Sequence, residues 1–146
     1  MLSDFQEIFV KVHNHIEIRK NSLRGLKRFK ASGLEGWFKV ETTIALENTK
    51  YAVKNWNNKG PDLLLEGDTE IELKAATDFN IEYIKQGVLK YDVPCLFLGN
   101  GSDRQKIDSL KSDNKLEIIG IEIFSCDKDE WVIGMIKPWH SVVHKD

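Results

Sequence analysis

The stretch from Pro61 to Lys74 constrains the fold and the chemistry of this chain more than any other. It begins with an apolar run, Leu63–Leu65, continues through a polar turn over residues 66–69, and ends in a run that carries Glu72 and Lys74. Residues two apart in a strand point to the same face of a sheet. We therefore expect Glu72 and Lys74 to project side by side.

Asp62, at the start of the first run, supplies a second carboxylate. Carboxylate oxygens are the ligands that Mg²⁺ prefers. A lysine beside them can orient or polarise a water, or steady a phosphate. The alternative is a solvated hairpin in which Glu72 and Lys74 form an ordinary charge pair.

The length of the turn decides whether Asp62 reaches Glu72. A two-residue loop at Gly67-Asp68 would pair Asp62 with Leu73 and turn its side chain away from Glu72, because a shift of one residue moves a side chain to the other face. A loop of odd length brings the two carboxylates to one face. We predict an odd loop, or an Asp62 that lies beyond the paired region.

Pro61-Asp62, nine intervening residues and Glu72-Leu73-Lys74 together resemble the signature of the PD-(D/E)XK nuclease superfamily. The resemblance implies an α/β (α+β) fold with a central mixed β-sheet flanked by helices, the restriction-endonuclease-like core. It also implies a phosphodiesterase that depends on Mg²⁺ or Mn²⁺. Asp62, Glu72 and the carbonyl of Leu73 would hold the metal, and Lys74 would position the attacking water.

A helix expected over Leu34–Asn48 carries an acid inside its apolar stripe. Glu41 falls where an i+7 position continues the spacing of the apolar residues Leu34, Trp37, Phe38, Ile44 and Ala45. Burying an ionised carboxylate is costly unless a cation or strong hydrogen-bond donors compensate its charge. A metal, a lysine or solvent in a cleft could provide this compensation. In the family that the signature resembles, a glutamate on this helix often joins the metal site, so we expect Glu41 there. The alternative is a glutamate that snorkels at the edge of the stripe.

Six cations fall within twelve residues, with no acid among them. The chain carries a net charge of −2, so its remainder carries −8. Such a segment is typical of a surface that contacts phosphates; the alternative is a solvated basic helix end and loop. A helix over Asp78–Tyr91 adds Lys85 and Gln86 as further candidates. The six cations are Arg19, Lys20, Arg24, Lys27, Arg28 and Lys30.

Length and composition predict one soluble domain. The chain has 146 residues, 41% hydrophobic and 30% charged, which is ordinary for a globular protein. We divide it into an N-terminal helix and basic segment (1–33), a core (34–98), and a C-terminal helix and hairpin (99–146). No apolar run approaches the ~20 residues that a membrane span needs. Cys95 and Cys126 lie in apolar runs and indicate reduced core residues of a cytoplasmic protein.

The core is expected to follow the order helix, three strands, helix, strand over Leu34 to Leu98. The leading hypothesis is a Mg²⁺-dependent endonuclease that acts on DNA, with RNA not excluded and a homodimer expected. One alternative is a catalytically silent nuclease-fold module that binds nucleic acid or a protein. A second is a protein–protein module that dimerises through its N-terminal helix.

His140 and His144, four apart in the tail, have no evident third ligand and indicate no metal site.

Overall fold

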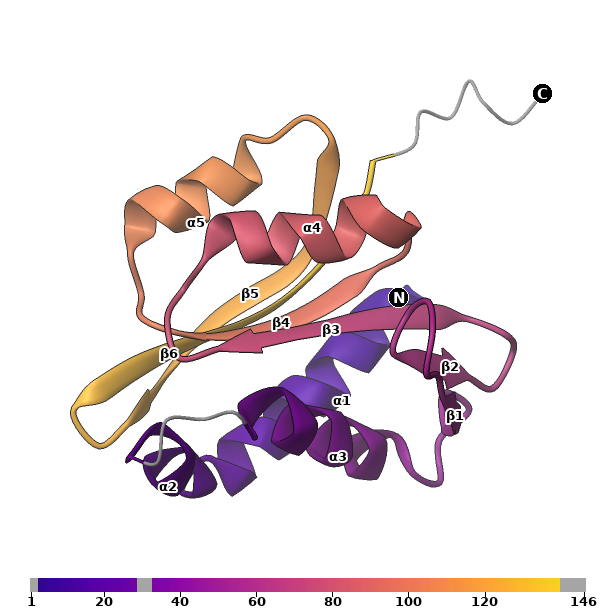
Figure 1. Ribbon diagram of the computed structural model, residues 1–146, viewed down its shortest axis with the longest axis horizontal. Helices are drawn as coiled ribbons and strands as arrows, with labels where there is room; N and C mark the ends of the chain where they lie inside the picture. The colour runs from indigo at the N-terminus through magenta and orange to yellow at the C-terminus, as the bar shows by residue number, and fades with distance from the viewer. Residues whose placement is uncertain (1–2, 29–32, 140–146) are drawn as a thin grey trace.

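The computed structural model describes residues 3–28 and 33–139, and the side chains of Lys27 and Arg28 are outside that description. The molecule has three layers (Figure 1). A six-stranded sheet with the order β1-β2-β3-β4-β6-β5 lies between helices α1–α3 on one face and α4–α5 on the other. The helices are α1 (Asp4–Arg19), α2 (Ser22–Arg28), α3 (Leu34–Leu46), α4 (Ile81–Tyr91) and α5 (Arg104–Lys111). The strands are β1 (Val53–Trp56), β2 (Leu63–Leu65), β3 (Glu70–Ala76), β4 (Cys95–Asn100), β5 (Leu116–Cys126) and β6 (Asp129–Pro138).

The sheet is mixed, as expected. Strands β1, β2 and β3 form an antiparallel meander, and β4 runs parallel to β3. Helix α4 connects β3 to β4, which is the crossover that a parallel pair requires. Strand β6 then pairs antiparallel with both β4 and β5. The expected order of helix, three strands, helix, strand is therefore confirmed over α3 to β4.

The loop between β2 and β3 has an odd length, which confirms the register prediction. Leu63 pairs with Ile71 and Leu64 with Glu70. The backbone N–H of Leu65 donates to the carbonyl of Thr69 at 2.8 Å, which leaves residues 66–68 in the turn. Extending this register by one residue sets Asp62 opposite Glu72, on the same face.

The meander packs one face against α1 and α3. Leu63, Leu65, Ile71 and Leu73 are fully buried in the same cluster as residues of those helices. Leu64 points the other way and is only half-buried. The face that carries Glu72 and Lys74 instead looks toward α4.

Two helix boundaries differ from expectation. Helix α3 ends at Leu46 and not at Asn48, and α4 begins at Ile81 and not at Asp78. A separate helix, α2, starts at Ser22 within the basic segment. Cys95 and Cys126 are both buried and unpaired. Among the described helices, none combines the length and the apolar character that crossing a membrane requires.

Candidate functional site

Strand β3 has an open edge next to β2, and carboxylates occupy it. The β2–β3 ladder ends at the pair Leu63–Ile71. Beyond it, the N–H of Leu73 donates to Asp62 Oδ2 at 2.9 Å, and the N–H of Ala75 donates to Glu35 Oε2 at 3.3 Å. Two side-chain carboxylates thus stand where the next strand would continue. We call the group that gathers here the edge site; its members are Glu35, Asp62, Glu72, Lys74 and Tyr83.

Asp62 and Glu72 are held against each other. Glu72 Oε1 accepts a hydrogen bond from the backbone N–H of Asp62 at 3.1 Å, and Glu72 is 5% exposed. Burial is the largest cause that raises the pKa of Glu72, to about 7, and the Asp62 side chain is the second. Lys74 lowers this pKa in part. When two carboxyl groups lie together in a poorly solvated site, ionising both of them is unfavourable. The edge site therefore disfavours the ionised form of Glu72 in spite of the nearby lysine.

Lys74 is fixed between β3 and α4. Its Nζ lies 3.5 Å from Glu72 Oε2 and 4.4 Å from the ring centroid of Tyr83. Its aliphatic stem passes beside Gly87, where an added Cβ would lie 3.0 Å from Lys74 Cγ. A cation over a tyrosine face is attracted by the ring quadrupole. Helix α4 thus limits where the ammonium group can go.

Glu35 and Tyr83 belong to the site, although the sequence did not single them out. The hydroxyl of Tyr83 donates to Glu35 Oε2 at 2.5 Å. Burial and this bond raise the pKa of Tyr83, so the phenol stays protonated. Glu35 lies in the first turn of α3. An acid there is ordinary, because it complements the helix dipole, and the pattern gave no reason to select it.

Glu41, which the sequence placed in the metal site, is not brought to the edge site. Its side chain is buried, as expected, but it accepts from His15 Nε2 at 2.9 Å and from Arg19 Nε at 3.1 Å, both on α1. Six residues along a helix correspond to about 9 Å of rise and about 240° of rotation. Glu35 and Glu41 therefore face different neighbours. We call Glu41, His15 and Arg19 the Glu41 cluster.

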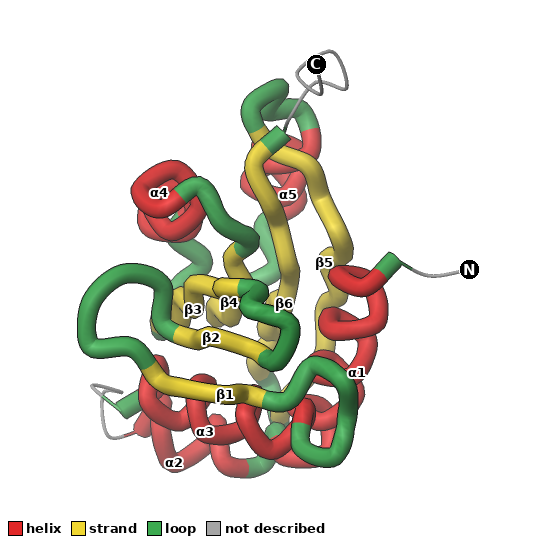
Figure 2. Tube along the Cα trace, turned by 90° about the vertical axis from the view of Figure 1, so that its right-hand side faces the viewer, coloured by secondary structure: helices red, strands yellow, loops and turns green. Residues whose placement is uncertain are grey.

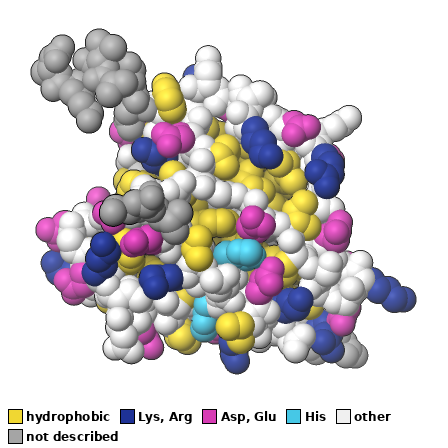
Figure 3. All heavy atoms as spheres, turned by 180° about the vertical axis from the view of Figure 1, so that it is seen from behind, with side chains coloured by type: hydrophobic (Ala, Val, Ile, Leu, Met, Phe, Trp, Pro, Cys, Tyr) yellow, Lys and Arg dark blue, Asp and Glu magenta, His cyan; other side chains and the backbone are white. Residues whose placement is uncertain are grey.

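The basic segment is partly neutralised by ion pairs. Besides Arg19 with Glu41, Arg24 Nε lies 2.6 Å from Asp127 Oδ2. Lys20 caps the end of α1, and its carbonyl accepts from Cys126 Sγ. The side chains of Lys27 and Arg28, together with all of Lys30, lie outside the described residues. On the back face of the molecule, basic side chains are interspersed with acidic ones (Figure 3).

The two candidates on α4 have different surroundings. Lys85 Nζ lies 2.9 Å from Asp113 Oδ2, and this contact lowers the pKa of Asp113. Gln86 is exposed and lines a shallow hollow on α4 with Leu89 and Lys90. Lys85 is therefore engaged in a structural ion pair, whereas Gln86 is accessible. His140 and His144 lie outside the described residues.

Within residues 3–28 and 33–139, no three His, Cys, Asp or Glu side chains gather closely enough to hold a metal ion. The edge site nonetheless offers two carboxylates. The carbonyl of Leu73 points to the same edge as its N–H, since both groups of a strand residue face one neighbour. Mg²⁺ is commonly bound by one or two carboxylates, with waters and substrate phosphates as the other ligands. The donor set fits this mode, and the raised pKa of Glu72 indicates a place where added positive charge is favourable.

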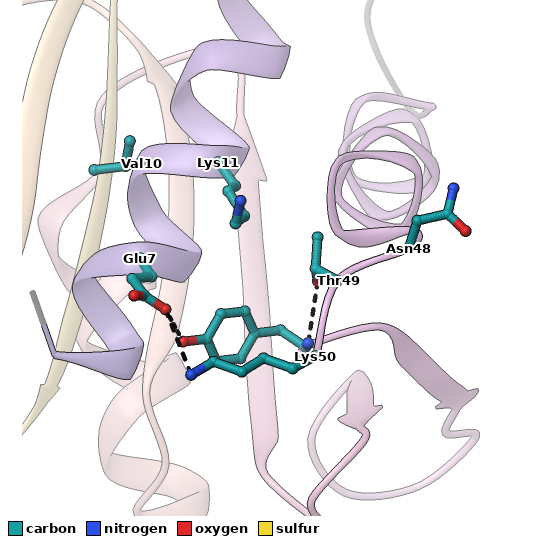
Figure 4. A pocket seen from close by; sticks show the side chains of 7 residues that line it. Glu7, Val10, Lys11, Asn48, Thr49 and Lys50 are labelled. Atoms are coloured by element: carbon teal, nitrogen blue, oxygen red, sulfur yellow. Dashed lines mark hydrogen bonds and ion pairs between the residues drawn. The ribbon is translucent and has the colours of Figure 1, made fainter.

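A second polar group lies at the start of α1, in a hollow lined also by residues 48–51 (Figure 4). The hydroxyl of Tyr51 donates to Glu7 and to Asp4, and Lys50 Nζ lies 3.6 Å from Asp4 Oδ1. Burial and these acids raise the pKa of Tyr51. The contacts join α1 to the segment before β1, which is a structural role.

Comparisons with known proteins return no match of a family model, a curated protein or a solved structure to this chain.

Proposed function

We propose that this chain hydrolyses phosphodiester bonds of DNA in a metal-dependent reaction. The observation that carries the proposal is the edge site, where Asp62, Glu72 and Lys74 meet although nine residues, a turn among them, lie between the first two. A hairpin with an incidental charge pair has no need to bury Glu72 against a second carboxylate. Acids with raised pKa values in a specific charged setting are typical of functional sites.

Asp62, Glu72 and the Leu73 carbonyl would hold the metal. A bound Mg²⁺ or Mn²⁺ polarises a phosphate oxygen and lowers the pKa of a bound water. The ammonium of Lys74 donates hydrogen bonds, so it can hold the oxygen of the attacking water or a phosphate oxygen beside Glu72. The Tyr83 ring and Gly87 keep that ammonium in place. Glu35 accepts hydrogen bonds from the Tyr83 hydroxyl and from the amide of Ala75.

The remaining expectations extend this proposal. Exposed cations of the segment from Arg19 to Lys30, with Gln86, would contact the DNA backbone, and such contacts weaken as salt rises. A twofold dimer would let two edge sites cut both strands of a duplex. RNA is an alternative substrate for the same chemistry, and a cytoplasmic location would suit either.

One alternative keeps the fold without the reaction: a module that binds nucleic acid or a protein. It is favoured by the missing third side-chain ligand among the described residues. Titration calorimetry with Mg²⁺ and Mn²⁺, on wild type and on Asp62→Asn, separates the two readings at the first step. Binding that the substitution abolishes supports a metal site.

The reaction itself is tested with single-stranded, duplex, flapped and branched DNA, and with RNA, in Mg²⁺, Mn²⁺ or EDTA. We expect metal-dependent cleavage that Asp62→Asn and Lys74→Ala each reduce by roughly 10²-fold or more. Lys50→Ala is the matched control, because Lys50 pairs with Asp4 in the other hollow and not with the edge site. Equal cleavage by wild type and both variants would refute the proposal.

A further inference from the structure

The end of β1 exposes an aromatic side chain beside α3. Trp56, the last residue of this edge strand, is 45% exposed. Val40 and Ile44, one turn apart on α3, are 40% and 43% exposed. Large apolar side chains that gather on a surface mark a place where something binds.

The indole of Trp56 is anchored, and its polar atom is satisfied. Its Nε1–H donates to Thr43 Oγ1 at 2.9 Å, and the Thr43 hydroxyl in turn donates to the carbonyl of Lys39 at 2.8 Å. The Lys39 ammonium lies 5.4 Å from the ring centroid. This chain of bonds fixes the ring orientation, so that a π-face and a cation are what the group offers to a ligand.

The backbone of Trp56 lies beside the edge site, and its ring lies on the α3 side of the sheet. Trp56 pairs with Leu63, the neighbour of Asp62, and the N–H of Asn57 donates to the Asp62 carbonyl at 3.0 Å. On α3, Lys39 follows Glu35 by four residues, about 6 Å of rise on the same side of the helix. Figure 2 shows the β1–β2 loop and the start of α3 on the same side of the molecule as α4. Glu35, which contacts β3, and Lys39, which lies beside the Trp56 ring, thus connect the edge site to that ring along α3.

We propose that Trp56, with Lys39 beside it, stacks one unpaired nucleobase of the strand that is bound at the edge site. The proposal rests on the function proposed above and narrows its substrate to single-stranded DNA, or to an unpaired segment next to a duplex. Bases inside a duplex are covered on both faces by their neighbours, so only an unpaired base can stack on a protein ring. Stacking on aromatic side chains, with lysine and arginine on the phosphates, is how single strands are bound without sequence preference.

Lys39 favours a nucleotide over an apolar protein surface. A protein that covered Val40, Ile44 and Trp56 would also bury the Lys39 ammonium, which is costly without a partner. A nucleotide brings its own phosphate, which can take the ammonium as the base takes the ring. The charge beside the ring therefore matches a nucleic acid.

The test is equilibrium binding in EDTA, where cleavage does not interfere, to a fluorescent oligothymidine and to a blunt duplex. Trp56→Leu retains apolar bulk without a π-face, and Trp56→Phe retains a ring. We expect Trp56→Leu to weaken single-strand binding by about tenfold, within the range for one stacked base, with little change for the duplex. Trp56→Phe should retain most of the affinity. The matched control is Trp139→Ala, because Trp139 is 56% exposed and lies directly after β6, which is four places from β1 in the sheet order.

Three results would overturn the proposal: single-strand affinity unchanged in Trp56→Leu, equal losses for single strand and duplex, or an equal loss in Trp139→Ala. A change of self-association in Trp56→Leu without a change in DNA affinity would assign the surface to a protein contact and also overturn it. Asp62→Asn separates this inference from the reaction. If Asp62→Asn abolishes cleavage while Trp56→Leu binds as wild type, the proposed reaction is supported and the proposed stacking is refuted. If Trp56→Leu loses binding while Asp62→Asn cuts normally, Trp56 is supported as a DNA-binding residue and the proposed chemistry of the edge site is refuted.

Discussion

Helix α3 contributes Glu41 to the Glu41 cluster and Glu35 to the edge site. The acids in these two places have different neighbours. In the Glu41 cluster, one buried carboxylate meets His15 and Arg19. In the edge site, Glu72 lies against Asp62 and 3.5 Å from Lys74, Glu35 bonds Tyr83, and the pKa of Glu72 is raised to about 7. A buried acid that accepts hydrogen bonds from an arginine and a histidine joins two helices. A buried acid that lies against a second acid, and whose pKa is raised, would be stabilised by an added cation. Such an arrangement is typical of functional sites.

The largest expected difference between the Glu41 cluster and the edge site comes from neutralising one glutamate in each. Glu41→Gln should lower the free energy of unfolding by roughly 1.5–3 kcal/mol, because it removes charged hydrogen bonds to His15 and Arg19; Arg19 is half exposed, which keeps the loss below that of a fully buried pair. Its cleavage rate should match wild type. Glu35→Gln should instead lower cleavage by roughly 10- to 100-fold, as the loss of a supporting carboxylate does, with a smaller loss of stability.

Urea denaturation and initial cleavage rates on the same preparations check both halves. A Glu41→Gln variant that folds as stably as wild type but cuts poorly would reverse the assignment of the two glutamates.

The second prediction uses pH. Because the folded protein raises the pKa of Glu72 from 4.5 to about 7, the folded state binds a proton more tightly than the unfolded state. The stability linked to Glu72 is therefore complete below about pH 4.5 and is lost as pH rises through 7, by on the order of 3 kcal/mol. In EDTA, Glu72→Gln should flatten this decline between pH 5 and 8.5, whereas Glu41→Gln should keep it.

Unfolding free energies in urea at several pH values provide the measurement. Adding Mg²⁺ at pH 8.5 should restore part of the loss in wild type, since a ligand that binds only the folded state stabilises it. A wild-type slope that Glu72→Gln leaves unaltered would contradict the charge assignment.

The contrast between the two groups also separates what the sequence reveals from what it hides. The meeting of Asp62, Glu72 and Lys74 follows from local rules, namely alternation along a strand and the parity of one loop. The choice between Glu35 and Glu41 does not. Both are acids on one helix, and which of them meets β3 depends on how α3 crosses the sheet, a contact 40 residues apart in the case of Glu35 and Ala75.

The basic segment shows the same limit. Its charge is visible in the sequence, but the acid that pairs with Arg24 is Asp127, on the turn between β5 and β6. A cation count predicts a phosphate-binding surface only when the acids that fold against it are known. The helix, strand and sheet classes were predictable because periodicity and turn residues are local signals.

The third prediction concerns the positioning of Lys74. An added Cβ at Gly87 would lie 3.0 Å from both Lys74 Cγ and Cys95 Sγ, so Gly87→Ala must displace the lysine. We expect cleavage to fall about tenfold, because small misplacements of a reacting group are costly. Stability should change little, since the helix propensity of alanine, worth about 1 kcal/mol, offsets the crowding.

Gly36→Ala in α3 is the matched control, because an added Cβ there meets nothing within 4 Å. It should leave cleavage unchanged and raise the melting temperature. Equal cleavage by both alanine variants would show that α4 does not set the position of Lys74.

The smallest expected effect lies next to Glu41, on the same helix. Thr42 is fully buried, and its hydroxyl finds no hydrogen-bond partner within the described parts of the chain. Thr42→Val replaces that hydroxyl with a methyl group of similar shape, so stability should rise by up to about 1 kcal/mol. Thr43→Val is its counterpart, because the Thr43 hydroxyl bonds both Lys39 and Trp56. It should lose about 1 kcal/mol and loosen the Trp56 ring, visible as a change in tryptophan fluorescence. Equal effects of the two substitutions would mean that hydrogen bonding at α3 does not distinguish its satisfied polar groups from its unsatisfied one.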